Sequence, residues 1–182
     1  MISGPSGAGK GTLIDALLPR FGALALAISA TTRPVRPGEV EGEDYYFLTP
    51  EAFTARVLAG DFLEHVTYAD NSYGTLREEV ERLVSEGCSV VVEIELRGAR
   101  AIRSMLPDAV TIFIAPPSPE ALGERLRRRG KDSAEAIARR LEESVAELAA
   151  QGEFDHVIVN DDAERAADEL EQVVSRYLHG SD

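Results

Sequence analysis

The chain has one cysteine, no tryptophan and three histidines among its 182 residues. A single cysteine, Cys88, excludes an internal disulfide, and the histidines, at 65, 156 and 179, lie too far apart in the sequence to indicate a metal site. No stretch approaches the roughly 20 apolar residues of a membrane-spanning helix. Positive charge is scarce too, because 19 Lys and Arg residues stand against 32 Asp and Glu, a formal net charge of −13. We therefore expect neither nucleic acid nor a membrane as a partner.

What remains is the composition of a globular protein, with 44% hydrophobic and 28% charged residues. This length allows one well-buried core, so we expect a single domain, and oligomeric state stays open. Because Met1 is followed at once by structural sequence, we expect no signal peptide. The lone cysteine and the absence of targeting signals favour a cytoplasmic location.

A glycine-rich stretch, residues 4–12, leads directly into an apolar-periodic run at 13–18. This pattern is typical of a phosphate-binding loop that opens a helix, in which glycines let successive backbone N–H groups face one anion. Lys10 would reach the β- and γ-phosphates of a nucleotide. The alternative, a plain loop, is disfavoured by the amphipathic helix behind it. The candidate ATP-binding residues here are Gly4, Ser6, Gly7, Ala8, Gly9, Lys10, Gly11 and Thr12.

One position departs from the usual motif, which has a hydroxyl residue directly after the lysine. Here Gly11 follows Lys10, and Thr12 comes one place later. We expect Mg²⁺ to accompany ATP as cofactor and to be held mostly by nucleotide phosphates and water. Contacts of Thr12 with the α-phosphate and with the metal both stay open.

Strands alternate with helices along most of the chain. Strands are expected at 1–3, 24–30, 88–94, 109–115 and 155–160, with helices between them. This alternation predicts an α/β fold of three layers, with a central parallel sheet of about five strands. Residues 33–75 interrupt it as a small strand-rich insertion, which ends in a turn at 70–74 and a capping box formed by Thr75 and Glu78. The predicted organisation is a core of residues 1–32 and 76–182, the insertion 33–75, and a helical lid at about 124–142.

Arg33 and Arg36 lie in a loop bounded by prolines and a glycine, and Tyr45 and Tyr73 are close to them in the pattern. Two arginines three residues apart can clamp a second phosphate, and the tyrosine hydroxyls can donate to it. The alternative is a solvated basic loop in an acidic protein.

Arg125 and Arg129 stand four residues apart on a predicted helix, and Arg140 is on the next one. Such a cluster can close over a triphosphate and neutralise the charge of the transferred group, although a solvated charged face is the alternative. Glu93 and Glu95 end the strand at 88–94, where open α/β sheets bind ligands. They can hold the hydration shell of Mg²⁺ or position an acceptor, or they can lie at a solvated sheet edge.

These motifs occur together, in order, at residues 4–10, 29–39, 44–47, 73–75, 112–118 and 157–162. The chain resembles the guanylate kinases, P-loop enzymes that pass the γ-phosphate of ATP to GMP or dGMP, and the match runs from Ser3 almost to the end. The resemblance implies that residues 33–75 are a GMP-binding insertion. It assigns the GMP phosphate to Arg33, Arg36, Tyr45 and Tyr73, the guanine to Ser29, Glu64 and Thr75, and further GMP contacts to Glu93 and Glu95. It makes Lys10, Arg125, Arg129 and Arg140 catalytic and places Asn160 near the adenine of ATP.

Guanine presents two adjacent donors that match the two oxygens of one ionised carboxylate, so Glu64 would select guanine over adenine. The alternative is that Glu64 is a solvated strand residue, because a shift of one residue in register would turn its side chain to the other face. The family usually has Asp at positions 93 and 95 and commonly an aromatic residue at 65, where this chain has Glu93, Glu95 and His65. None of these changes removes an acid or a phosphate-binding group, so we expect activity.

Two other functions are compatible with parts of this pattern. A guanylate-kinase-like binding module, as in scaffold proteins, would keep the fold without catalysis, but such modules typically lose parts of the phosphate loop that are intact here. A P-loop kinase for another phosphorylated acceptor, such as a sugar bisphosphate, is disfavoured by the tyrosines and arginines of the insertion and by Glu64.

Overall fold

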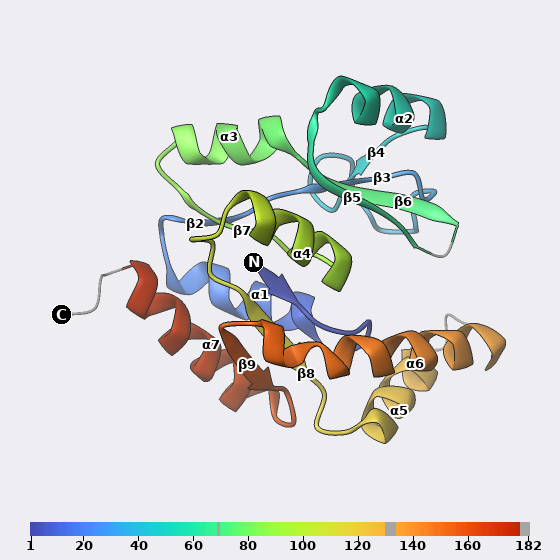
Figure 1. Cartoon of the computed structure of the whole chain (residues 1–182). Coiled ribbons are helices and arrows are strands. Elements are labelled where there is room, and N and C mark those ends of the chain that lie inside the picture. The colour runs from blue at the N-terminus through green and yellow to red at the C-terminus, as the bar shows by residue number, and fades with distance from the viewer. Residues whose placement is uncertain (69, 130–133, 179–182) are drawn as a thin grey trace. The chain divides into compact units, whose positions relative to one another are not determined.

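The computed structural model describes residues 1–68, 70–129 and 134–178 (Figure 1). The chain forms two compact units, one made of Met1–Gly22 with the described part of Val110–Asp182, the other of Ala23–Ala109. The expected division into core, insertion and lid stays a prediction.

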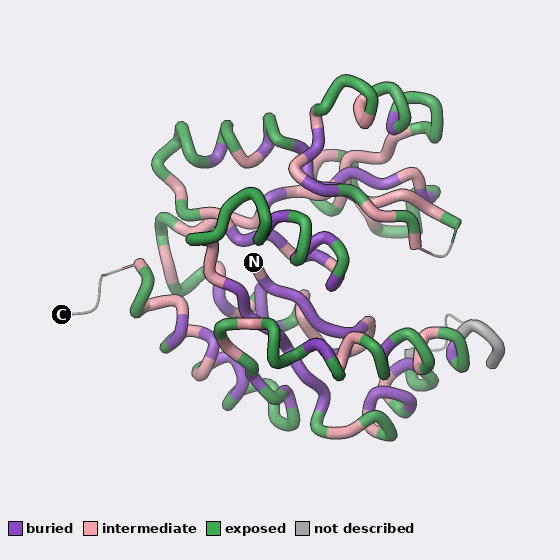
Figure 2. Tube along the Cα trace, in the orientation of Figure 1, coloured by how far each residue is buried: buried purple, intermediate pink, exposed green. Residues whose placement is uncertain are grey.

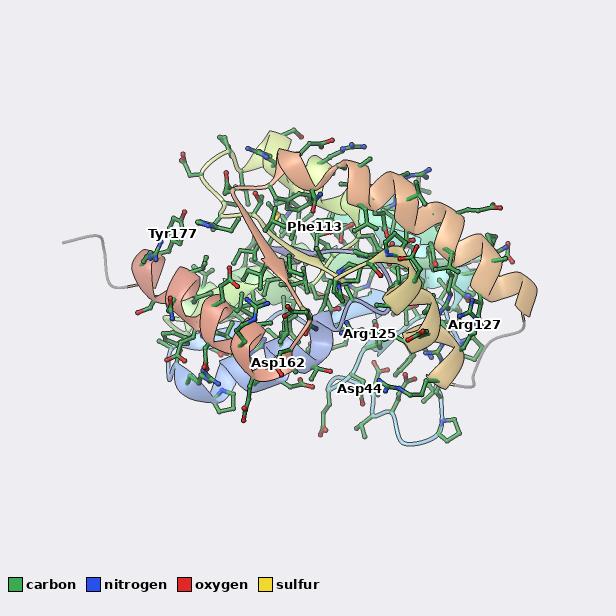
Figure 3. The ribbon with its side chains drawn as sticks, turned by 90° about the horizontal axis from the view of Figure 1, so that it is seen from below. Asp44, Phe113, Arg125, Arg127, Asp162 and Tyr177 are labelled. Carbon is green, nitrogen blue, oxygen red and sulfur yellow. The ribbon has the colours of Figure 1, made fainter. Side chains whose placement is uncertain are left out.

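The first unit is built on a parallel sheet of three strands in the order β1-β8-β9. They are β1 (Ile2–Ser3), β8 (Ile112–Ala115) and β9 (His156–Val159). All four residues of β8 are buried, as Figure 2 shows, and Phe113, labelled in Figure 3, is fully buried. This is expected of a parallel strand covered on both faces.

Helices of the first unit surround this sheet. They are α1 (Lys10–Leu17), continued by the 3₁₀ turn η1 (Leu18–Arg20), α5 (Pro119–Arg129), α6 (Ala134–Ala149), followed by η2 (Gln151–Glu153), and α7 (Ala163–Leu178). α1 and α7 lie side by side, and the Arg20 guanidinium pairs with Asp168 at 2.8 Å. α5 and α6 share an apolar contact made by Leu122, Leu126, Ile137 and Leu141. From the sequence we expect one helix to end at Gly130 and the next to start near Ser133, and both positions lie outside the described residues.

The second unit contains two sheets. β2 (Leu24–Leu26) pairs in parallel with β7 (Ser89–Val91). A mixed sheet has the order β4-β3-β6-β5, formed by β4 (Tyr46–Phe47), β3 (Ser29–Thr31), β6 (Asn71–Leu76) and β5 (Phe62–Tyr68). Three helices complete the unit, α2 (Pro50–Ala59), α3 (Arg77–Ser85) and α4 (Leu96–Met105), and both α2 and α4 pack on β5 (Figure 1).

The single strand expected at 24–30 is wrong, because the chain changes sheets within it. Ala27 N donates to Val91 O at 2.9 Å, beside the β2–β7 pair, and Ser29 then begins β3 in the mixed sheet. Between them, the Ile28 N–H points to the buried Glu79 carboxylate of α3, at 3.4 Å. A long-range polar partner therefore replaces the ladder bond that would have continued the strand.

The turn at 70–74 and the cap at Thr75 are also wrong. Asn71–Leu76 forms β6, and the reversal is confined to the neighbourhood of Asp70, whose φ is 64°. The N-cap of α3 is Leu76, without a side-chain hydrogen bond. The Thr75 hydroxyl donates instead to Glu64 Oε1 at 2.9 Å, because a buried carboxylate is a stronger partner than an exposed helix end.

Candidate functional site

The loop between β1 and α1 passes three times through backbone conformations that favour glycine. Gly4, Gly7 and Gly9 have φ values of 143°, 93° and 97°. A Cβ at Gly4 would lie 2.2 Å from the backbone oxygen of Ile114, and one at Gly9 would lie 2.4 Å from Asn160 Nδ2. The loop is therefore held against the carboxyl ends of β8 and β9, and a side chain at either glycine would displace it.

Lys10 begins α1, and its ammonium lies across this loop. Nζ donates to Gly4 O at 2.5 Å and to Pro5 O at 3.4 Å. The N-cap, Gly9, offers no side-chain bond to the first turn, and that turn carries no acidic residue. The positive end of α1 and the Lys10 ammonium thus lie at the same loop, an arrangement typical of anion sites at helix N-termini.

Two side chains support the loop from the rest of the first unit. Asn160, buried just after β9, donates from Nδ2 to Ala8 O at 2.7 Å. Arg125 of α5 donates from Nη1 to Ala8 O at 3.2 Å and from Nη2 to Asn160 O at 2.8 Å (Figure 3). The structure thus brings two predicted residues from distant elements to the phosphate loop.

The remaining predicted residues of this unit lie in the loop, at the start of α1 and on the two helices α5 and α6. Ser6 and Gly11 are half-buried, and Thr12 is exposed in the first turn of α1. Arg140 is half-buried on α6. The side chain of Arg129 lies outside the described residues, so the arginine trio stays a prediction.

In the second unit, the three residues predicted to face guanine form one row across the mixed sheet. Ser29 of β3 pairs with Thr75 of β6, and Thr75 pairs with Glu64 of β5. Glu64 is 6% exposed, and its Oε1 accepts both from Thr75 N, at 3.1 Å, and from the Thr75 hydroxyl. Glu64 is therefore a buried, anchored carboxylate, which rejects the alternative of a solvated strand residue.

A register shift between Phe62 and Glu64 explains how these residues, two positions apart, face opposite sides of the sheet. Phe62 stacks on Phe53 of α2 at 4.5 Å, and the His65 ring lies edge-on to both. Glu64 points instead to α4, where a Cβ at Gly98 would lie 2.4 Å from Glu64 Oε2. The bulge re-aims the carboxylate, as bulges near sites commonly do.

Burial raises the pKa of Glu64, and the charge of Glu95 acts in the same direction, while the Thr75 hydrogen bonds oppose the shift. Glu95 itself is the N-cap residue of α4 and makes no side-chain cap bond. Both carboxylates therefore belong to one polar region at the start of α4.

The residue Arg33 is 8% exposed, and its guanidinium is paired with Glu39. Nη1 donates to Glu39 Oε2 at 3.0 Å, and Nη2 donates to Oε1 at 2.8 Å. The guanidinium carbon lies 5.3 Å from the centre of the Tyr45 ring and 5.8 Å from that of Phe47. Arg33 is therefore fixed by an ion pair and by ring contacts, which excludes a solvated basic loop for this residue.

Tyr45 connects the predicted phosphate-binding residues. Its ring lies edge-on to Tyr73 at 6.3 Å, and burial raises the pKa of its hydroxyl, an effect that the charge of Glu93 reinforces. Tyr45 thus stays protonated near neutral pH and can donate a hydrogen bond. Arg36 is exposed, with its backbone N–H bonded to Glu39.

Two residues at this site were not singled out from the sequence. Glu39 lies six places after Arg33 in the same short loop, and an acidic residue so near in the sequence was a signal of the ion pair. Gly98, in the first turn of α4, carried no local signal, since its lack of a side chain is required by Glu64, 34 positions earlier in the sequence.

Among the described residues, no three His, Cys, Asp or Glu side chains form a group that could hold a metal ion. No helix in that part of the chain is long and apolar enough to cross a membrane.

Known proteins resemble this chain in sequence and in fold. The guanylate kinase family model matches residues 1–177. The guanylate kinase of Nostoc sp. is 53% identical over 171 residues, 94% of this chain and 86% of that protein. The guanylate kinase of Rubrobacter xylanophilus is 49% identical over 182 residues, 100% of this chain and 95% of that protein.

A solved structure shows the same fold. The crystal structure of guanylate kinase from Anaplasma phagocytophilum has a TM-score of 0.75 and 33% identity, and the match covers 97% of this chain and 83% of that one. This confirms the predicted P-loop α/β fold class. By family model, by sequence and by structure, the chain belongs to the guanylate kinase family.

Proposed function

We propose that this chain is an ATP:GMP phosphotransferase that converts ATP and GMP, or dGMP, into ADP and the nucleoside diphosphate. An oxygen of the acceptor phosphate attacks the γ-phosphorus of ATP, and the bond from that phosphorus to the bridging oxygen breaks, leaving its electron pair on ADP. Catalysis of this kind depends mainly on positioning and on charge stabilisation. Family membership supports the enzyme class, and we propose the cytoplasm as its location.

The observation that carries the proposal is the buried carboxylate of Glu64 in a row with Thr75 and Ser29. An ionised Glu64 can accept from N1–H and N2–H₂ of guanine together. Adenine would turn the lone pair of its N1 toward the same carboxylate. Sites with such a buried polar match reject the mismatched analogue by about 10⁴–10⁵-fold.

The acceptor phosphate is assigned to Arg33, Arg36, Tyr45 and Tyr73. Arg33 supplies a positioned guanidinium, Arg36 an exposed one, and the tyrosines supply hydroxyl donors. Glu93 and Glu95 complete this region as acceptors for the nucleoside.

ATP is assigned to the phosphate loop, with its phosphates on backbone N–H groups of the segment 4–12 and its adenine near Asn160. Lys10 and Arg125, with Arg129 and Arg140, would stabilise the charge that develops during transfer. Thr12 and the phosphates would hold Mg²⁺, because the described loop offers a hydroxyl but no carboxylate cluster, and the metal would supply charge neutralisation.

The test is ADP release measured with GMP, dGMP, AMP, UMP and ribose phosphates as acceptors. GMP and dGMP should be preferred by a large factor, and Glu64→Gln should lower kcat/KM for GMP by about 10–100-fold, because an amide donor then opposes a guanine donor. Glu81→Gln, on the exposed face of α3, is the matched control and should behave as wild type. Phosphorylation of AMP at a rate near that of GMP, or native GMP kinetics in Glu64→Gln, would remove the guanine assignment.

A further inference from the structure

The Arg33 side chain has five N–H donors in a planar fork, and three of them are already assigned. Nη1 donates to Glu39 Oε2 at 3.0 Å and to Pro34 O at 2.8 Å. Nη2 donates to Glu39 Oε1 at 2.8 Å. Both Nη1 hydrogens and one Nη2 hydrogen are therefore used by the protein.

The two remaining donors lie on one edge of the guanidinium. Glu39 covers the edge between Nη1 and Nη2, and Pro34 takes the Nη1 hydrogen on the side of Cδ. The hydrogen of Nε and the second hydrogen of Nη2 point the other way, side by side. In the described part of the chain neither has an acceptor, and this edge matches two oxygens of a phosphate.

We propose that Glu39 is a positioning residue, which holds Arg33 so that its Nε–Nη2 edge receives the acceptor phosphate. This rests on the proposed function, because the phosphate is that of GMP. Glu39 does not touch the phosphate in this scheme and acts through Arg33 alone.

The surroundings favour positioning over competition between carboxylate and phosphate. Arg33 is also held by Pro34 and by the rings of Tyr45 and Phe47, so its plane is set from several sides. Glu39 in turn accepts from Arg36 N at 2.7 Å, which ties the carboxylate to its own loop. A phosphate can therefore bind to the open edge without displacing Glu39.

The test is a double-mutant cycle of Glu39→Gln, Arg33→Met and the double variant, with KM for GMP, KM for ATP and kcat measured for each. Gln offers Arg33 one acceptor instead of two and sets a donor against it. Glu39→Gln should raise KM for GMP by about 10–100-fold, the range for a hydrogen bond to a charged group, and leave KM for ATP unchanged. In the Arg33→Met background the same change should alter KM for GMP by less than about twofold, because the group it positions is gone.

The control is Glu43→Gln, which removes the same charge from an exposed position in the same segment and should leave all three constants at the wild-type values. Glu39→Asp keeps both acceptors on a shorter stem, so it should raise KM for GMP less than Glu39→Gln does. If Glu39→Gln does not fold, as judged by circular dichroism, Glu39→Asp carries the test, and it must raise KM for GMP alone.

Three results would overturn the inference while the proposed function stands: a lower KM for GMP in Glu39→Gln, an unchanged one, or an increase of equal size without Arg33. A lower value would mean that Glu39 competes with the phosphate. A wild type that does not phosphorylate GMP would overturn both proposals together.

Discussion

The two candidate nucleotide sites of this chain are built in opposite ways. In the phosphate loop the predicted ligand groups are backbone N–H groups, and the conformations of Gly4, Gly7 and Gly9 set the course of the loop. In the second unit they are predicted to be side chains, Arg33 for the phosphate and Glu64 for the guanine, and each is held by another residue: Glu39 pairs with Arg33, and Thr75 donates to Glu64. The geometry of the backbone site therefore depends on the conformation of its own segment. The geometry of the side-chain site depends also on Glu39 and Thr75, which hold Arg33 and Glu64 in place.

The largest effect is expected from removing the one charged side chain of residues 4–12, that of Lys10. Lys10→Met should lower kcat by about 10²–10³-fold or more, the effect of removing one group that stabilises the transition-state charge. The fold should persist, because the glycines and the support from Asn160 are unchanged. Steady-state ADP release and circular dichroism would measure both.

Arg77→Met, which removes a cation from the exposed start of α3, is the control and should be silent. Near-native turnover of Lys10→Met would show that the loop binds nucleotide by its backbone alone, and the catalytic role of the lysine would be withdrawn.

The same contrast explains what the sequence could predict. The loop is contiguous, so its glycines and the helix behind it were visible locally, and the structure confirms a helix from Lys10 and left-handed glycines. The row of Ser29, Thr75 and Glu64 needs strand register and a bulge, which no local pattern records. The Thr75 hydroxyl could have bonded to the nearby start of α3, but it donates to Glu64, 11 positions away in the sequence.

Long-range partners also account for the split of the expected strand at 24–30, where Glu79 lies 51 positions from Ile28. The family and the fold could be predicted because several short motifs in order suffice for them. The roles of individual site residues stay predictions, because each role is a contact with ATP or GMP.

Gly98→Ala tests whether the side-chain site depends on the residues behind its ligands. The added Cβ would lie 2.4 Å from Glu64 Oε2, so the carboxylate or the first turn of α4 must shift. We expect KM for GMP to rise by about 10-fold, comparable to the loss of one charged hydrogen bond, with KM for ATP unchanged.

Gly152→Ala is the matched control, because a Cβ there would meet nothing within 4 Å. If Gly98→Ala raised KM for ATP as much as KM for GMP, or left both unchanged, the idea that Gly98 makes room for the guanine-binding carboxylate would fail.

The smallest effect expected concerns pH, and it separates stability from binding at Glu64. Burial raises the pKa of this carboxyl above the ordinary value of 4.5. Below that value the carboxyl is protonated whether the chain is folded or unfolded. As pH rises, the unfolded chain loses its proton first, so the free energy of unfolding falls until the folded carboxyl has also ionised.

Glu64→Gln has no such proton, so the Tm of the wild type minus that of the variant should fall between pH 4.5 and the raised pKa and then stay level. Each kcal/mol corresponds to about 2–4 °C in a chain of this size.

Over the same window the affinity for GMP should rise with pH, because only the ionised form accepts both guanine donors. Thermal scans and GMP titrations of wild type, Glu64→Gln and Glu81→Gln across this range would measure both trends. A difference in Tm that does not change with pH would mean that Glu64 titrates as an exposed carboxyl does. The side-chain site would then not rest on a buried carboxylate, and its contrast with the backbone site would fail.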